Sequence, residues 1–124
     1  MGLEKRGYSV LVVSASESFN STLLTLLPES TYSPVHMVSN ISAAKRSLAE
    51  RPYDYVIINA PLPDDLGTRF AIDTCNAKGT VVLLLVRSDI YADVYDKVTE
   101  YGAFTLSKPI SKPAMATALS WVIF

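Results

Sequence analysis

The chain has 124 residues, a length that fits one domain spanning residues 1–124. Hydrophobic residues make up 49% and charged residues 19%, which favours a compact globule and argues against disorder. The formal net charge is −1, so the chain has no electrostatic basis for holding nucleic acid by itself. A single cysteine, Cys75, excludes an internal disulfide, and the aliphatic run 81–86 is far shorter than the roughly 20 residues that span a membrane. We therefore expect a cytoplasmic protein that does not contact membranes.

Apolar runs and helical patterns alternate five times along the chain. Strands are expected over residues 8–13, 35–38, 55–58, 80–86 and 103–106, because these runs are rich in β-branched and apolar residues. Helices are expected over residues 17–27, around Ile41 to Leu48, over 68–75 up to Lys78-Gly79, over 89–101, and from between Pro109 and Pro113 to the end. Ser14 and Glu17 match a capping box for the first helix, and Ser88 or Asp89 is the expected N-cap of the fourth.

This alternation predicts a parallel sheet covered by helices on both faces, in three layers. Ligands of such sheets bind outside the carboxyl ends of the strands. The residues at those ends are Ser14-Ala15, Asn59-Ala60, Val86-Arg87 and Ser107-Lys108. We therefore look for chemistry at these positions.

Two stretches carry a specific resemblance. Residues 53–67 are Tyr-Asp-Tyr-Val-Ile-Ile-Asn-Ala-Pro-Leu-Pro-Asp-Asp-Leu-Gly, and a second stretch is Lys108-Pro109. The chain is similar over nearly its whole length to receiver domains of two-component response regulators. In that family a phosphoacceptor Asp stands where Asn59 lies, and Pro63 and Gly67 occupy the expected places. The resemblance implies a flavodoxin-like (βα)5 fold with five parallel strands in the order 2-1-3-4-5, and a cis bond before Pro109 that holds Lys108 toward the phosphoryl site.

The departures from the family concern its chemistry. Ser14 and Ala15 replace the two acids that hold Mg²⁺ in receivers, and Asn59 lacks the carboxylate from which an acyl phosphate forms. Val86 replaces the Thr or Ser that hydrogen-bonds the phosphoryl group. Of that chemical set only Lys108 remains. The resemblance therefore implies a degenerate, or pseudo-, receiver with no catalytic residues, no metal and no cofactor, and not an enzyme.

The functional hypothesis is a regulatory module that works without phosphorylation. Degenerate receivers of this kind resemble the N-terminal domains of ANTAR-type antiterminator regulators, so RNA would be contacted only by an output domain outside this chain. Whether Phe124 is a natural end is left open.

Receivers commonly pair with protein partners, or with a second copy, through the face of their fourth helix, fifth strand and fifth helix. Tyr91 and Tyr95 share one side of the expected fourth helix, and Phe104 lies on the fifth strand, so these residues are candidates for that face. A partly covered aromatic pair is an equal alternative. The resemblance also puts Thr105 where receivers carry an aromatic residue, with Phe104 displaced by one position.

The alternative function is a flavodoxin-like domain that binds a small anion or a nucleotide. Ser14, Ser16 and Ser18 lie at the start of the first helix, where amide groups and the helix dipole favour anions, and Lys108 would add a positive charge. The competing interpretation is that the serines only cap a helix and that Lys108 hydrogen-bonds Asn59 or a backbone carbonyl. Asp64 and Asp65 are interpreted as solvated turn residues, with Asp65 capping the third helix.

Overall fold

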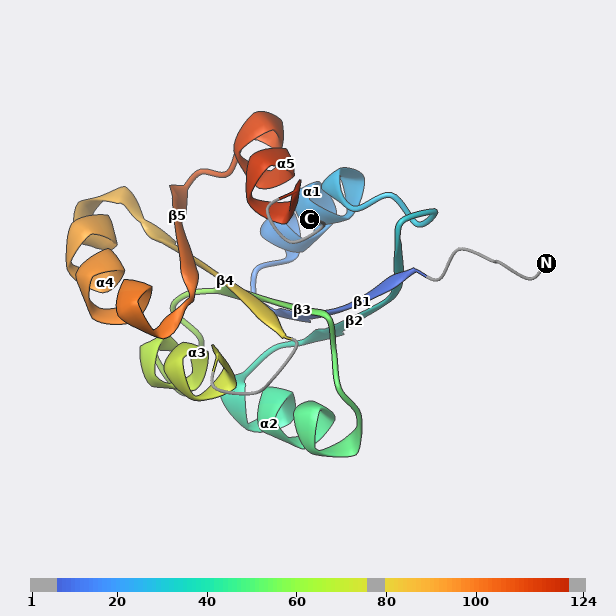
Figure 1. Ribbon diagram of the computed structural model, residues 1–124, viewed down its shortest axis with the longest axis horizontal. Coiled ribbons are helices and arrows are strands. Elements are labelled where there is room, and N and C mark those ends of the chain that lie inside the picture. Colours follow the sequence, from blue (N-terminus) through green and yellow to red (C-terminus); the bar gives the residue numbers. More distant parts are fainter. Residues whose placement is uncertain (1–6, 76–79, 121–124) are drawn as a thin grey trace.

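A computed structural model describes residues 7–75 and 80–120. Strands and helices alternate along them (Figure 1). The strands are β1 (Tyr8–Val13), β2 (Tyr32–Val38), β3 (Tyr55–Asn59), β4 (Val81–Arg87) and β5 (Phe104–Lys108). The α-helices are α1 (Glu17–Leu26), α2 (Ile41–Glu50), α3 (Thr68–Cys75), α4 (Tyr91–Val98) and α5 (Lys112–Ser120), and two 3₁₀ turns, Ser88–Ile90 and Thr99–Tyr101, flank α4.

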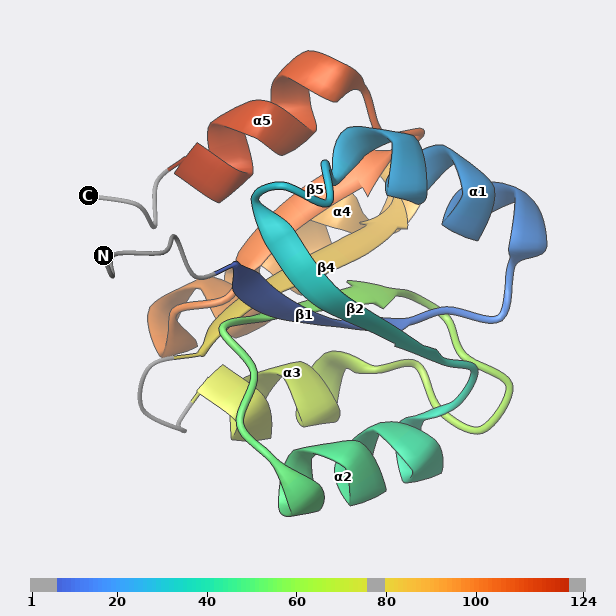
Figure 2. The same cartoon turned by 90° about the vertical axis from the view of Figure 1, so that its right-hand side faces the viewer.

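The five strands form one parallel sheet in the order β2-β1-β3-β4-β5. Helices α1 and α5 cover one face, and α2, α3 and α4 cover the other (Figures 1 and 2). This confirms the predicted three-layer architecture and strand order. The carboxyl ends of the strands therefore meet at one edge of the sheet.

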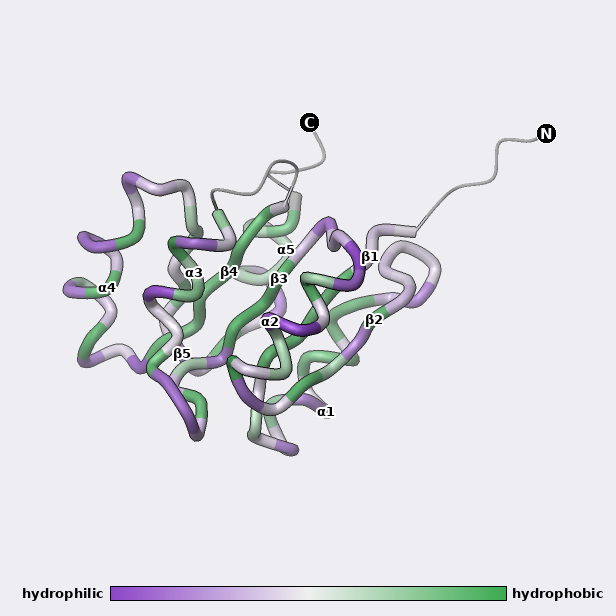
Figure 3. The backbone as a smooth tube through the Cα atoms, turned by 90° about the horizontal axis from the view of Figure 1, so that it is seen from below, coloured by the Kyte–Doolittle hydropathy of each residue, from purple (hydrophilic) through white to green (hydrophobic). Residues whose placement is uncertain are grey.

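The inner strands explain the continuous apolar runs of the sequence. Successive side chains of a strand point to opposite faces, so Leu11 packs with α2 and α3 while Val12 packs with α1 and α5. Since both faces are covered, every residue of β3 is buried, and the hydrophobic colouring follows the strands through the centre of the molecule (Figure 3). Each such Val, Leu or Ile contributes roughly 1.5–3 kcal/mol through its burial.

The start of β2 and the N-cap of α1 differ from the sequence-based expectation. β2 begins at Tyr32, three positions early, because Tyr32 pairs with Tyr8 of β1 ahead of the irregular stretch at Ser33-Pro34. The N-cap of α1 is Ser16, whose hydroxyl accepts a hydrogen bond from the Phe19 amide. The predicted capping box starting at Ser14 was therefore wrong, because the Ser14 hydroxyl is engaged elsewhere.

The fourth helical segment is also less regular than expected. The expected helix over 89–101 is divided into a 3₁₀ turn, α4 and a second 3₁₀ turn, and neither Ser88 nor Asp89 makes a side-chain cap. Asp89 instead forms an ion pair with Arg87, with 2.8 Å between Nη2 and Oδ2. Gly102 ends the segment as predicted, with a φ of 99° that favours glycine.

Two expectations fall on residues outside the described ranges: the end of the third helix at Lys78-Gly79 and the continuation of the last helix beyond Ser120. Within residues 7–75 and 80–120, the structure contains no helix that is both long enough and apolar enough to cross a membrane.

Candidate functional site

Three of the predicted site residues meet at the carboxyl edge of the sheet. Ser14 follows β1, Asn59 ends β3 and Lys108 ends β5. Although β4 separates β3 from β5, the long Lys108 side chain reaches across it. Its Nζ donates hydrogen bonds to Asn59 Oδ1 and to the Ala60 carbonyl, each 2.7 Å long. Ser14, Asn59 and Lys108, which the sequence placed at one edge of the sheet, are therefore neighbours in the structure.

Asn59 links the two ends of this cluster. Its Nδ2 donates a 3.2 Å hydrogen bond to the Ser14 hydroxyl, which also accepts from the Ser16 amide. Asn59 is 7% exposed and Ser14 is 3% exposed, so both are buried polar groups that need partners. The Ser14–Asn59–Lys108 network satisfies them without a ligand.

The peptide bond between Lys108 and Pro109 is cis, as the family resemblance implies. Partial burial lowers the pKa of Lys108, and the positive charge of nearby Arg87 lowers it further. The geometry thus brings two cationic side chains to the same edge, one bonded to neutral oxygens and the other paired with Asp89.

The side chains at this edge do not fit Mg²⁺, the ion that receiver chemistry uses. This ion prefers carboxylate and water oxygens in an octahedral arrangement. Here the Asn59 and Ala60 oxygens already accept hydrogen bonds from the Lys108 ammonium group, whose charge would repel a metal ion. Among the described residues, no group of three or more His, Cys, Asp or Glu side chains could hold a metal.

The other two positions singled out from the family resemblance, Val86 and Ala15, lie apart from the network. Val86 is buried in the core beneath the sheet edge, where its side chain packs with apolar neighbours. Ala15 is exposed at the turn before α1. Neither residue supplies a side-chain oxygen or nitrogen to the site.

The predicted anion cluster is only partly assembled. The Ser16 hydroxyl caps α1 and lies 3.3 Å from the Ser18 hydroxyl, while Ser14 bonds Asn59. Lys108 is bonded to Asn59 and to a backbone carbonyl, in agreement with the competing interpretation. Ser18 and Lys108 nonetheless both line a cavity of about 590 Å³, together with Arg87.

The two aspartates of the loop after β3 are exposed, as predicted, but Asp64 also contacts a distant helix. Asp64 accepts hydrogen bonds from the Ile41 and Ser42 amides, at 2.9 and 3.1 Å, and so holds the start of α2. The Ile41 amide bond is the main reason that the pKa of Asp64 is lowered. Asp65 accepts from the Gly67 amide and does not cap α3, so only the predicted cap was wrong. Nothing in the local sequence pairs Asp64 with a helix 22 residues away.

Gly67 matches the family pattern for a structural reason. Its φ is 101°, a conformation that side chains disfavour, and an added Cβ would lie 3.2 Å from the Ile58 side chain. Glycine is therefore required where the loop returns to the sheet.

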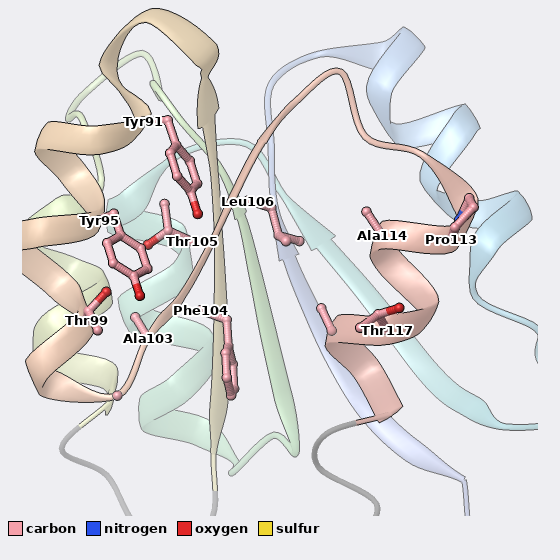
Figure 4. Close-up of a pocket in the computed structure, with 12 residues that line it drawn as sticks. Tyr91, Tyr95, Thr99, Ala103, Phe104, Thr105, Leu106, Pro113, Ala114 and Thr117 are labelled. Atoms are coloured by element: carbon pink, nitrogen blue, oxygen red, sulfur yellow. The ribbon is translucent and has the colours of Figure 1, made fainter.

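The candidate interaction face contains the predicted tyrosines. The Tyr91 and Tyr95 rings stack with centroids 5.8 Å apart, and Tyr95 is 42% exposed. Phe104 packs on the opposite side of β5, against the α1 and α5 side of the core. A cavity of about 790 Å³ extends along β5 between α4 and α5 (Figure 4). Sequence reasoning did not anticipate this cavity; its one signal was Thr105 at a position where receivers carry an aromatic residue.

The sequence matches no protein-family model. It also matches no curated protein. The structure, in contrast, resembles many solved structures.

A signal receiver domain of an HD domain-containing protein from Pseudomonas fluorescens Pf-5 has a TM-score of 0.82 and 25% identity, covering 99% of this chain and 91% of that one. A CheY-like receiver domain from Methylobacillus flagellatus has a TM-score of 0.80 and 21% identity, covering 94% and 99%. The receiver domain of the sensor histidine kinase PA1611 from Pseudomonas aeruginosa, with magnesium coordinated in its active-site cleft, has a TM-score of 0.76 and 18% identity, covering 96% and 100%. The chain described here has the flavodoxin-like, CheY-like fold of response-regulator receiver domains.

Proposed function

We propose that this chain is a regulatory receiver-type domain that acts through protein contacts and does not use aspartyl phosphorylation. The observation that carries the proposal is the contact between Lys108 and Asn59. A phosphoacceptor must offer a nucleophilic carboxylate. Asn59 offers a neutral amide whose oxygen is held by the Lys108 ammonium group. The network that surrounds it is closed by neutral partners, Ser14 and the Ala60 carbonyl.

The surface supports a role in contacts. Tyr95 is exposed beside the stacked Tyr91, and tyrosine is enriched at protein interfaces because its rigid ring buries much area at small entropic cost. We propose that the face of α4, β5 and α5 pairs with a protein partner or with a second copy of the chain. On this account residues 1–124 form a single domain in the cytoplasm.

The output of such a module would be transcriptional. The resemblance to ANTAR-type regulators supports an antitermination output, in which RNA is bound by a separate domain. The net charge of −1 agrees with RNA binding by a separate domain, because this chain has no net positive charge to attract the RNA backbone.

Sedimentation equilibrium tests the proposal when the protein is examined with and without Mg²⁺ and phosphoramidate, a small phosphoryl donor. We expect concentration-dependent association that is identical in the two conditions. Mass spectrometry of the two samples should give the same intact mass. A phosphoryl adduct, or association that appears only with the donor, would contradict the proposal.

A second candidate function rests on the cavity shared by Ser18, Arg87 and Lys108. Lys108 and the start of α1 favour an anion such as a phosphate group, although Asp89, which also lines the cavity, pairs with Arg87. Inorganic phosphate and flavin mononucleotide, added separately, would then shift the amide resonances of the first loop and of Lys108. Unchanged resonances in both titrations rule this candidate out.

A further inference from the structure

The cavity along β5 is separate from the vestigial phosphorylation site. It lies at the edge strand of the sheet, between α4 and α5, and neither Asn59 nor Lys108 lines it. Its volume of about 790 Å³ lies within the roughly 300–1,000 Å³ range of pockets that hold small organic molecules. The size therefore suits a compact ligand.

The lining of this cavity is free of charge. The described residues that form it are apolar or carry hydroxyl groups, and none of them is Asp, Glu, Lys, Arg or His. One wall is the stacked pair Tyr91 and Tyr95, and the opposite wall is made of small residues of α5, including Ala114 and Thr117 (Figure 4). A charged ligand would lose hydration here without gaining a counter-charge. The cavity therefore selects for an uncharged molecule.

One polar group in the lining of this cavity has no hydrogen-bond partner among the described residues. The Thr105 hydroxyl is buried and makes no hydrogen bond with any described residue, and Thr105 as a whole is 7% exposed. Its side chain points toward the tyrosine pair (Figure 4). A hydroxyl can donate one hydrogen bond and accept two, and native structures rarely leave such a group unpaired when it is buried. An unmet partner is thus expected on this side of β5.

The tyrosine pair that covers Thr105 can admit such a partner. Tyr95 is 42% exposed and its ring stacks on that of Tyr91, so a turn of the ring toward solvent would give up little buried area. Aromatic rings also offer flat faces that favour offset stacking with another ring. A planar ligand could replace one ring in the stack and reach the hydroxyl beneath.

We propose that this cavity binds an uncharged, planar aromatic molecule that carries one hydrogen-bonding group. The ring system packs against Tyr91 and Tyr95, and the polar group pairs with the Thr105 hydroxyl. This site does not depend on how the vestigial phosphorylation site behaves.

The test uses the 124-residue protein and N-phenyl-1-naphthylamine, an uncharged fluorescent aromatic with one N–H group. Its matched comparison is 1-anilinonaphthalene-8-sulfonate, the same molecule with an added negative charge. We expect saturable binding of the neutral probe and binding of the sulfonate weaker by about tenfold, because the cavity offers the charge no partner. Equal or tighter binding of the sulfonate would overturn the proposal.

Three variants test where the probe binds. Ala114→Trp fills the cavity from an exposed position and should abolish saturable binding, whereas Ala116→Trp, exposed on the same helix outside the cavity, should leave it unchanged. Thr105→Val should lower the affinity for the neutral probe by about fivefold, because one hydrogen bond is lost. Equal behaviour of the two tryptophan variants, or unchanged affinity in Thr105→Val, would contradict the assignment. Probe binding is measured at a protein concentration at which sedimentation shows a monomer, because the proposed pairing face shares Tyr91 and Tyr95 with the cavity.

Discussion

The ammonium group of Lys108 lies 2.7 Å from the amide oxygen of Asn59, across the carboxyl edge of the sheet. The two residues are 49 positions apart and end β5 and β3. This contact gives a partly buried cation a neutral partner where the receiver family has a carboxylate. Lys108 is thus held by hydrogen bonds within this chain.

Removal of the Asn59 side chain should therefore destabilise the protein. In Asn59→Ala, Lys108 keeps only the Ala60 carbonyl and Ser14 loses its amide donor, at a cost of roughly 1.5–3 kcal/mol in the free energy of unfolding. Asn59→Asp should cost less, because a carboxylate accepts from Lys108 and from the Ser14 hydroxyl. Urea denaturation measures both. An Asn59→Asp variant less stable than Asn59→Ala would contradict the role given to the lysine.

The stability contributed by Asp64 should depend on pH. Its pKa lies below the ordinary value of 3.8, mainly because the ionised carboxylate accepts a hydrogen bond from the Ile41 amide. A lowered folded-state pKa stabilises the fold above about pH 3.8, and this contribution disappears as the pH falls through the folded pKa. Asp64→Asn should lower the melting temperature at pH 7, with a difference from the natural protein that shrinks below pH 3.8. Asp96→Asn, on an exposed site of α4, is the control, and a pH-independent difference in Asp64→Asn would count against the cap.

The unpartnered hydroxyl of Thr105 predicts an unusual stabilising substitution. Thr105→Val keeps the side-chain shape and removes a buried group that makes no hydrogen bond with the described residues. We expect the free energy of unfolding to rise by about 1 kcal/mol in the absence of ligand, while Thr105→Ser, which loses a methyl group instead, should lower it. Chemical denaturation compares the three proteins. Destabilisation by valine would mean that the hydroxyl already has a partner.

The proposed interaction face predicts the effect of a charge at Tyr95. Tyr95→Lys puts a charged group on the face of α4, β5 and α5 and should weaken self-association by about tenfold. Leu24→Lys is the matched control, because Leu24 is a similarly exposed apolar residue on α1, away from this face. Sedimentation velocity at several concentrations separates them. An equal effect of the two lysines would exclude this face.

Much of the fold followed from local patterns. The buried runs of β1 and β3 and the start of α3 were predicted correctly, because burial on both faces leaves an apolar signal that needs no knowledge of neighbours. Errors occurred where a distant contact decides local structure. Tyr32 belongs to β2 because it pairs with Tyr8, and Asp64 caps a helix that precedes it in the chain.

The candidate site divides in the same way. The positions of Ser14, Asn59 and Lys108 followed from the rule that strand ends meet at one edge, and the lysine contact was one of two alternatives considered. The cavity along β5 could not be predicted, because it arises from small side chains on separate elements, such as Thr105 and Ala114, that become neighbours only in the folded chain.

The most direct test of the central claim is an amide NMR titration of the unaltered chain with Mg²⁺ and beryllofluoride, a mimic of the phosphoryl group. An ordinary receiver domain with its full set of acids serves as the reagent control. We predict that the amide resonances around Asn59, Val86 and Lys108 do not move under conditions that saturate the control. Saturable shifts centred on Asn59 would show that the site still binds metal and phosphoryl group, and would contradict the account of a receiver fold that has lost its phosphorylation chemistry.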